Sequence, residues 1–560
     1  TRRSSDLITD MKLMFNGCGR LKNLDLSSFD TKNVNNMYGM FLGCKKITSL
    51  NITNFDTSQV TDMYSMFAGC ESLSELDIKN FNTSNVEDMA TMFMDCINLK
   101  DIKITHFKTD KVIDMFSMFE NCSKIQNLDL TNFNTINVAD MSRMFRNCVE
   151  LTNIYYDINK FQTSLVYDME YMFANTKIKN IDLSKFDTNK VEKMAHMFEQ
   201  DEYLVNLDLR NFKTDALEDI SYMFYKCTSL NELKIEFSNT KNILNMNYMF
   251  AEVDNLFSLN LTSFVMNNLK YMNYAFLNCK NLNNLIIPNF NTKNARTMEG
   301  LFSNCKSLYS LDLKNFDTSK VTQMKSMFEN CNNLKTLILS DKFITSKVND
   351  MYHMFSGCHY LNKLNVSSFD TSKVTNMEQM FSDCTYLANL NLNNFNTENV
   401  QTMNSMFKNC YGITSINLQN FNTKNVEDFS YMFYTCSNLN NLDVSKFDFN
   451  KAKTVYRMFG ECKNLENIEL NNYNSFDKLK VHPNIALKNA QDNFNINNIQ
   501  QDIIVNHMFP STKALPKTKY GWLVSFVDKG VAIYEMAHYK AIMQLGILLI
   551  FIFNLVSVQN

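Results

Sequence analysis

The chain repeats itself with a period of 26 residues, and this period constrains its fold more than any other feature. A Phe recurs from Phe15 to Phe459, usually with Met before it and Cys three residues after it, which gives 18 units. Of the 17 intervals, 14 are 26 residues long, and the exceptions of 28, 25 and 27 residues end at Phe173, Phe198 and Phe355. A unit this short cannot bury an apolar face alone, so stacked copies are expected to form a solenoid.

Each unit combines two hydrophobic periodicities. Met63, Met66, Phe67 and Cys70 lie at i, i+3, i+4 and i+7, a spacing that predicts a short amphipathic helix. The following segment "LSELDI" (73–78) places apolar residues at every second position near its end, which predicts a short strand. We therefore expect each unit to contain a strand, a turn and a short helix. The segment "VTDM" before the helix is a candidate for a second very short strand.

The constant register predicts ladders of identical side chains along the stack. We expect Phe to lie on Phe and Cys on Cys in a continuous core. The predicted core ladder begins with Phe15, Phe41, Phe67, Cys18, Cys44 and Cys70.

The 15 Cys residues favour buried free thiols over a disulfide framework or a metal site. Every Cys lies three residues after an anchor Phe, and three units carry Thr176, Asp201 or Val253 instead. Stacked Cys residues would have parallel Cβ vectors, which is a poor geometry for a disulfide. No C-x-x-C motif occurs, so we expect no metal and no cofactor. Cys is small and packs well in a core.

The segment "CKSLYSLDLKNFDTSKVTQMKSMFENC" (305–331) resembles the BspA-like leucine-rich repeat. More narrowly, it is similar to the 26-residue repeat subfamily first noted in mycoplasma lipoproteins, and the resemblance covers about residues 8–470. It implies an α/β repeat solenoid, a leucine-rich-repeat-like right-handed stack of about 18 strand–turn–short helix units with a parallel sheet. It also implies a cell-surface or secreted protein that adheres to host proteins or to other cells, without enzymatic activity.

Alternation along the strands predicts a column of outward side chains that faces a ligand, if the resemblance to leucine-rich repeats holds. Seven Asp in this column could attract cations or a basic partner, whereas interleaved Asn and Lys are also typical of a solvated strand face. Ile286, Ile338 and Glu469 occupy equivalent positions. The candidate ligand-binding face comprises Asp25, Asn51, Asp77, Lys103, Asp129, Asp182, Asp208, Lys234, Asn260, Asp312, Asn365, Asn391, Asn417 and Asp443.

Two further features are candidates for function. A ladder of turn Thr residues either binds an ordered surface such as a glycan or caps turns through local hydrogen bonds. The irregular zone from Tyr155 to Glu202 contains a two-residue insertion, a shortened unit and two units without Cys, and breaks of this kind mark either a binding site or neutral drift. The Thr ladder comprises Thr31, Thr57, Thr83, Thr109, Thr135, Thr163, Thr188, Thr214, Thr240, Thr292 and Thr318.

Three regions follow from the repeat boundaries. We expect a solenoid at 1–472, a terminal cap and linker at 473–540, and a hydrophobic segment at 541–558. The last segment has 18 uncharged residues, the lower limit for a membrane span. It predicts a membrane anchor, a glycosylphosphatidylinositol signal or a buried helix. The chain begins inside a repeat, which is typical of a fragment or a processed product.

Composition and motifs narrow the function classes. A net charge of −3 gives no electrostatic footprint for nucleic acid. Neither G-x-S-x-G, a phosphate-binding loop nor H-E-x-x-H occurs, so an enzyme is not predicted. The leading hypothesis is a membrane-anchored surface protein that binds an extracellular protein or glycan. The alternative is a cytoplasmic protein–protein interaction scaffold that uses the same repeat face.

Overall fold

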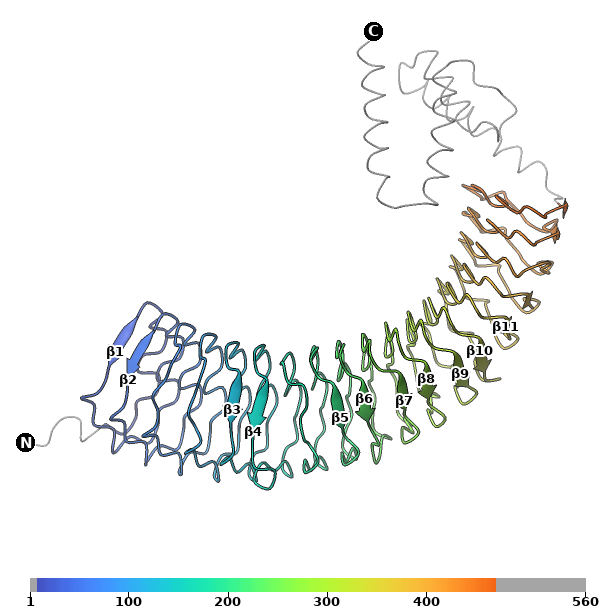
Figure 1. The fold of residues 1–560 in the computed structure, drawn as a ribbon. Helices are drawn as coiled ribbons and strands as arrows, with labels where there is room; N and C mark the ends of the chain where they lie inside the picture. The colour runs from blue at the N-terminus through green and yellow to red at the C-terminus, as the bar shows by residue number, and fades with distance from the viewer. Residues whose placement is uncertain (1–7, 470–560) are drawn as a thin grey trace, which may run out of the picture. The chain divides into compact units, whose positions relative to one another are not determined.

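The computed structural model describes residues 8–469, which form a stack of turns with short parallel strands (Figure 1). The strands of this part of the chain are β1 Asn23–Asp25, β2 Ser49–Asn51, β3 Asn127–Asp129, β4 Asn153–Tyr155, β5 Asn206–Asp208, β6 Glu232–Lys234, β7 Ser258–Asn260, β8 Asn284–Ile286, β9 Ser310–Leu313, β10 Thr336–Leu339, β11 Lys363–Leu364, β12 Asn389–Leu390, β13 Asn441–Asp443 and β14 Asn467–Glu469. Each strand comes from the segment whose alternation predicted it.

The strands pair in parallel with the register that the repeat requires. Leu24 of β1 lies opposite Leu50 of β2, and Leu311 of β9 lies opposite Leu337 of β10. The pairs follow one another along the stack in chain order, from β1 and β2 at the blue end of Figure 1 to β11. The parallel-strand solenoid predicted from the 26-residue period is therefore confirmed.

A second ladder runs through the segment that includes "VTDM". Single parallel bridges link Asp10 to Asn36, Asn36 to Asp62 and so on as far as Gln323. The run resumes at Asp350, on the other side of the 27-residue interval. The second strand predicted here is thus reduced to one bridged residue per turn.

The predicted short helices are wrong, because residues 8–469 contain no helix. Three overlapping turns occupy the Met–Phe–Cys segment instead, with hydrogen bonds from Met66 N to Met63 O (3.2 Å) and from Cys70 N to Phe67 O (3.1 Å). Ser65 and Gly69 have positive φ values of 52° and 72°, which interrupt helical geometry twice within four residues. The α/β assignment is corrected to an all-β solenoid for this part of the chain.

Hydrogen bonds between turns take the place of helical ones. Ser65 N donates to Ala90 O (3.0 Å), Phe67 N to Met92 O (2.9 Å) and Gly69 N to Met94 O (2.7 Å). Every second N–H therefore reaches the next turn, while those between close local turns. This division satisfies the backbone of a buried segment without a helix.

The core consists of stacked side chains. The rings of Phe41 and Phe67 are 5.6 Å apart and within 9° of parallel, and both side chains are fully buried, as are Cys44 and Cys70. Phe15 also stacks on Phe41 at 5.6 Å, but Phe15 is only half-buried and Cys18 is exposed, since no earlier described turn covers them.

Each buried thiol also has a hydrogen-bonding role. Cys70 Sγ donates to Phe41 O (3.4 Å) in the preceding turn, and the same contact recurs at Cys96 with Phe67 O (3.2 Å). Burial raises the pKa of the Cys44 thiol to about 11. All 15 Cys are free thiols.

The described residues belong to two compact units. One contains the turns up to Lys446 together with Val455–Glu469, and the other includes Phe447–Thr454. In the second unit, the rings of Phe447 and Phe449 are 6.1 Å apart and Ala452 N donates to Phe449 O (3.0 Å). The predicted linker at 473–540 and hydrophobic segment at 541–558 lie outside the described residues.

Candidate functional site

The strands present two outward columns on either side of a row of inward Leu and Ile. In β5, Leu207 is buried between exposed Asn206 and Asp208. The fourteen residues of the candidate face occupy the column that follows this inward row. Asn51, Asp129 and Asp443 are half-buried, and the other eleven are exposed.

The Asp and Asn residues of this column cap the turn that follows each strand. Asp25 Oδ1 accepts a hydrogen bond from Ser27 N (2.9 Å), and Asp182 Oδ1 accepts one from Ser184 N (2.9 Å). This bond to the backbone N–H of Ser27 is also the main reason that the pKa of Asp25 is lowered. All twelve Asp and Asn members of the candidate face make the same contact. Local turn chemistry therefore accounts for the residue type without a ligand.

Neighbouring cations neutralise part of this acidic column. Lys79 pairs with Asp77 at 3.0 Å, Arg210 with Asp208 at 2.6 Å and Lys314 with Asp312 at 3.2 Å. The hydrogen bond from Lys79 lowers the pKa of Asp77, and the bond from Arg210 does the same for Asp208. The arrangement resembles a solvated strand face more than a site for cations.

The Thr ladder lies inside the solenoid. Thr83 is 1% exposed, and its Oγ1 donates to Lys108 O (2.8 Å) while it accepts a bond from Lys108 N (2.8 Å). Every member of the predicted ladder is buried. These residues hydrogen-bond between turns, rather than locally as expected, and they present no surface to a ligand.

A second acidic column was missed at the sequence stage. Asp62, Asp88, Asp114 and Asp140 follow one another in the bridge ladder, each at the position before the first Met of the turn segment. Burial raises the pKa of Asp88 to about 6, and the neighbouring Asp114 and Asp62 contribute in the same direction. Each carboxylate caps its own turn, as when Ala90 N donates to Asp88 Oδ1 (2.9 Å). Among residues 8–469, no group of His, Cys, Asp and Glu is arranged to hold a metal ion.

The two-residue insertion creates a depression of about 640 Å³ beside β4. Tyr155 occupies the outward position and is 53% exposed, while Tyr156 takes the inward position and contacts Phe161 with ring centroids 5.2 Å apart. The Tyr156 hydroxyl donates to Asp182 O, and burial raises the pKa of Tyr156 to about 12. The depression is lined by Thr131, Ile154, Tyr155, Tyr156, Asp157, Ile158, Ile178, Asn180, Ile181 and Asp182.

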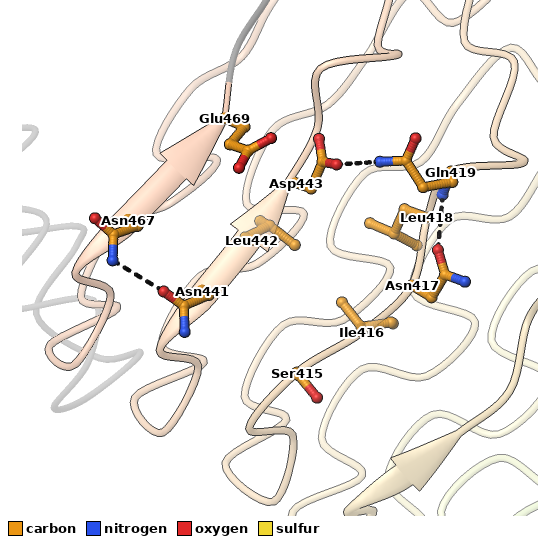
Figure 2. A pocket seen from close by; sticks show the side chains of 10 residues that line it. All are labelled: Ser415, Ile416, Asn417, Leu418, Gln419, Asn441, Leu442, Asp443, Asn467 and Glu469. Carbon is orange, nitrogen blue, oxygen red and sulfur yellow. Dashed lines mark hydrogen bonds between the residues drawn. The ribbon is translucent and has the colours of Figure 1, made fainter.

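A second depression, of about 530 Å³, lies over β13 and β14 and is more polar (Figure 2). Asn467 Nδ2 donates to Asn441 Oδ1 (3.0 Å), and Gln419 Nε2 donates to Asp443 Oδ2. Gln419 N also donates to Asn417 Oδ1 (3.1 Å), so the labelled amides of Figure 2 largely satisfy one another.

The repeat is that of a known family. The family described as "Mycoplasma protein of unknown function, DUF285" matches residues 4–76, 69–157, 149–256, 200–316, 245–363, 309–415 and 388–499. The chain belongs to this family. The match confirms the resemblance to BspA-like, mycoplasma-type repeats that the sequence predicted.

Solved structures with some similarity are also leucine-rich repeat proteins. A leucine-rich repeat protein from Bacteroides ovatus is 17% identical, with 57% of this chain and 88% of that chain covered and a TM-score of 0.30. A leucine rich cell surface protein from Faecalibacterium prausnitzii is 13% identical, with 75% and 79% covered and a TM-score of 0.24. A search among curated proteins finds no match to the chain. Within residues 8–469 we find no helix capable of spanning a membrane.

Proposed function

We propose that this chain is a non-enzymatic cell-surface protein that binds proteins of a host or of neighbouring cells through the outward face of its sheet. The observation that carries the proposal is the register of that face. Outward positions recur at the same place in successive turns, as for Asn206 beside Glu232 and Asp208 beside Lys234. Membership in a family of BspA-like repeats supports the surface location.

The face suits a large partner better than a small substrate. Parallel strands are about 4.8 Å apart, so successive turns place side chains at a spacing that an extended protein surface can contact repeatedly. The two depressions described above lie along this face, and polar side chains are exposed between them. Many weak contacts of this kind add up to useful affinity when they are made together.

Bulky substitutions on the face test the proposal. Ser49→Arg and Ser310→Arg enlarge exposed strand residues without removing a turn cap. We expect either change to weaken binding of the purified chain to cultured cells and to a panel of extracellular matrix proteins by tenfold or more. The matched control is Asn189→Arg on an exposed turn, which should leave binding unchanged. Equal binding by all three variants and the parent would refute the proposal.

Location is tested separately. Antibodies raised against the solenoid should stain intact, unpermeabilised cells of the native organism, and protease treatment of those cells should remove the stain. Staining that requires permeabilisation would favour the cytoplasmic scaffold.

A further inference from the structure

The depression at the irregular turn differs chemically from the rest of the sheet face. Tyr155 lies opposite Asp129 of β3 in the outward column, where twelve other turns carry Asp or Asn. Its ring is 53% exposed and borders the side chains of Ile154, Ile158 and Ile181. An aromatic ring beside branched aliphatic side chains on an otherwise polar face is typical of a protein-binding hot spot.

The rim of the depression is acidic and lacks the cations found elsewhere in the column. At Asp77, Asp208 and Asp312 a Lys or Arg two residues later neutralises the carboxylate. The residue two places after Asp182 is Ser184, and the residue two places after Asp157 is Asn159. In each case one carboxylate oxygen accepts a backbone N–H (2.9 Å), and the charge is left for another partner.

The depression is held in place by the core beneath it. Leu130 N donates to Tyr155 O (2.7 Å), and the Tyr156 hydroxyl bonds the backbone of Asp182 across the gap between turns. The anchoring of both walls means that a ligand would enter a preformed site and lose little free energy in ordering it.

We propose that this depression receives a bulky apolar side chain of a partner polypeptide, while a neighbouring Lys or Arg of that partner pairs with Asp182 or Asp157. The inference rests on the proposed protein-binding function and names the chemistry of the partner at one place. A peptide fits better than a sugar because four Ile side chains line the site, whereas a sugar requires hydrogen bonds to most of its hydroxyl groups. Charge complementarity selects a basic neighbour over an acidic one.

The test uses a phage-displayed library of random peptides twelve residues long, selected on the immobilised full chain. We expect the selected peptides to contain a Leu, Ile, Met, Phe or Trp next to Lys or Arg. Their affinities are then measured by fluorescence anisotropy. Tyr155→Ser should weaken binding at least tenfold. Asp157→Asn with Asp182→Asn should weaken it about fivefold at low salt and less at high salt, because salt screens exposed ion pairs.

The control variants lie in the same outward column but in other turns. Ile286→Ser removes an apolar side chain that is 38% exposed, and Asp25→Asn removes an acid while an amide oxygen can still cap the turn. Both should bind the peptides within twofold of the parent chain. Far-ultraviolet circular dichroism should show that every variant is folded.

Three outcomes would overturn the inference. These are a selection that yields no peptide dependent on Tyr155, peptides without the apolar–basic pair, or a glycan array on which binding depends on Tyr155. If Ser310→Arg weakens binding to cells and matrix proteins while Tyr155→Ser does not, the site inference fails and the proposed function stands. If neither variant changes that binding, the proposed function fails as well.

Discussion

A regular turn and the irregular turn share one interior but have different faces. At the regular turn of β9, Asp312 caps the chain and pairs with Lys314. At the irregular turn of β4, the outward residue is Tyr155 and two extra residues follow before Phe161. The Phe ladder is undisturbed, since Phe173 lies 5.6 Å from both Phe145 and Phe198. The comparison shows that the stack absorbs an insertion on its surface while the core keeps its spacing.

The interior substitutions near the irregular turn also occur as a matched set. Thr176 and Asp201 replace Cys in adjacent turns, and Asp201 Oδ1 accepts bonds from Thr176 N (2.7 Å) and Thr176 Oγ1 (3.0 Å). Asp201 is 2% exposed, and burial raises its pKa well above the usual range. A polar pair thus takes the place of two thiols, which satisfies groups that would otherwise be unpaired.

The largest expected effect tests whether the two interiors are equivalent. Phe67→Ala in a regular turn and Phe173→Ala in the irregular turn should each cost about 3–5 kcal/mol of local stability, because both remove a fully packed ring. Hydrogen exchange of the surrounding turns measures the loss. Phe15→Ala, at a half-buried position, should cost clearly less. A much smaller loss at Phe173 would show that the irregular core is looser.

The second prediction sharpens a difference between the two turns. Thr83 bonds both the N–H and the carbonyl of Lys108, whereas Thr163 has a bond to Asp187 O (2.8 Å). Thr83→Val should cost about 2–3 kcal/mol because it leaves two buried backbone groups unsatisfied, and Thr163→Val about 1 kcal/mol. Limited proteolysis compares the two variants. Thr131→Val, at an exposed position, is the control with little expected effect.

The smallest effect should have opposite signs in the two turns. Burial holds the folded pKa of Asp88 near 6, above that of the unfolded chain, so its ionisation destabilises the fold as pH rises from about 4 to 6. Asp88→Asn keeps an acceptor for Ala90 N and should raise stability by about 1 kcal/mol at pH 7. Asp168→Asn should lower it, because Asp168 pairs with Lys193 at 3.2 Å. Thermal unfolding at pH 4 and pH 7 measures both changes. A stabilised Asp168→Asn would show that this ion pair contributes nothing.

The sequence predicted the stack and its interior because the period and the inward residues are the same physical fact. Leu, Phe, Met and Cys recur where each turn must be apolar, and the strands follow the alternation around Leu207 and its equivalents. The helix prediction failed because an i, i+3, i+4, i+7 spacing also arises from overlapping turns. The difference lies in two positive-φ residues per unit, and these include His196 and Arg143, whose side chains give no sign of that conformation.

The site was only partly predictable. Asp and Asn in the outward column could be placed on the surface, but their capping role depends on the turn geometry that was mistaken for a helix. Tyr155 was absent from the predicted column because the insertion shifts the alignment of its turn. The acidic column at Asp88 lies at positions where one repeat alone shows a single ordinary Asp, and only stacking brings the carboxylates together.

The burial of the thiols has a practical consequence. Cys18 is exposed, Cys462 is half-buried and the other thirteen are buried with their sulfur atoms bonded to backbone carbonyls. A maleimide reagent should therefore modify Cys18 first and reach the others only as individual turns open. Because almost every turn carries its own thiol, the order in which the cysteines become labelled would record, turn by turn, how the solenoid comes apart.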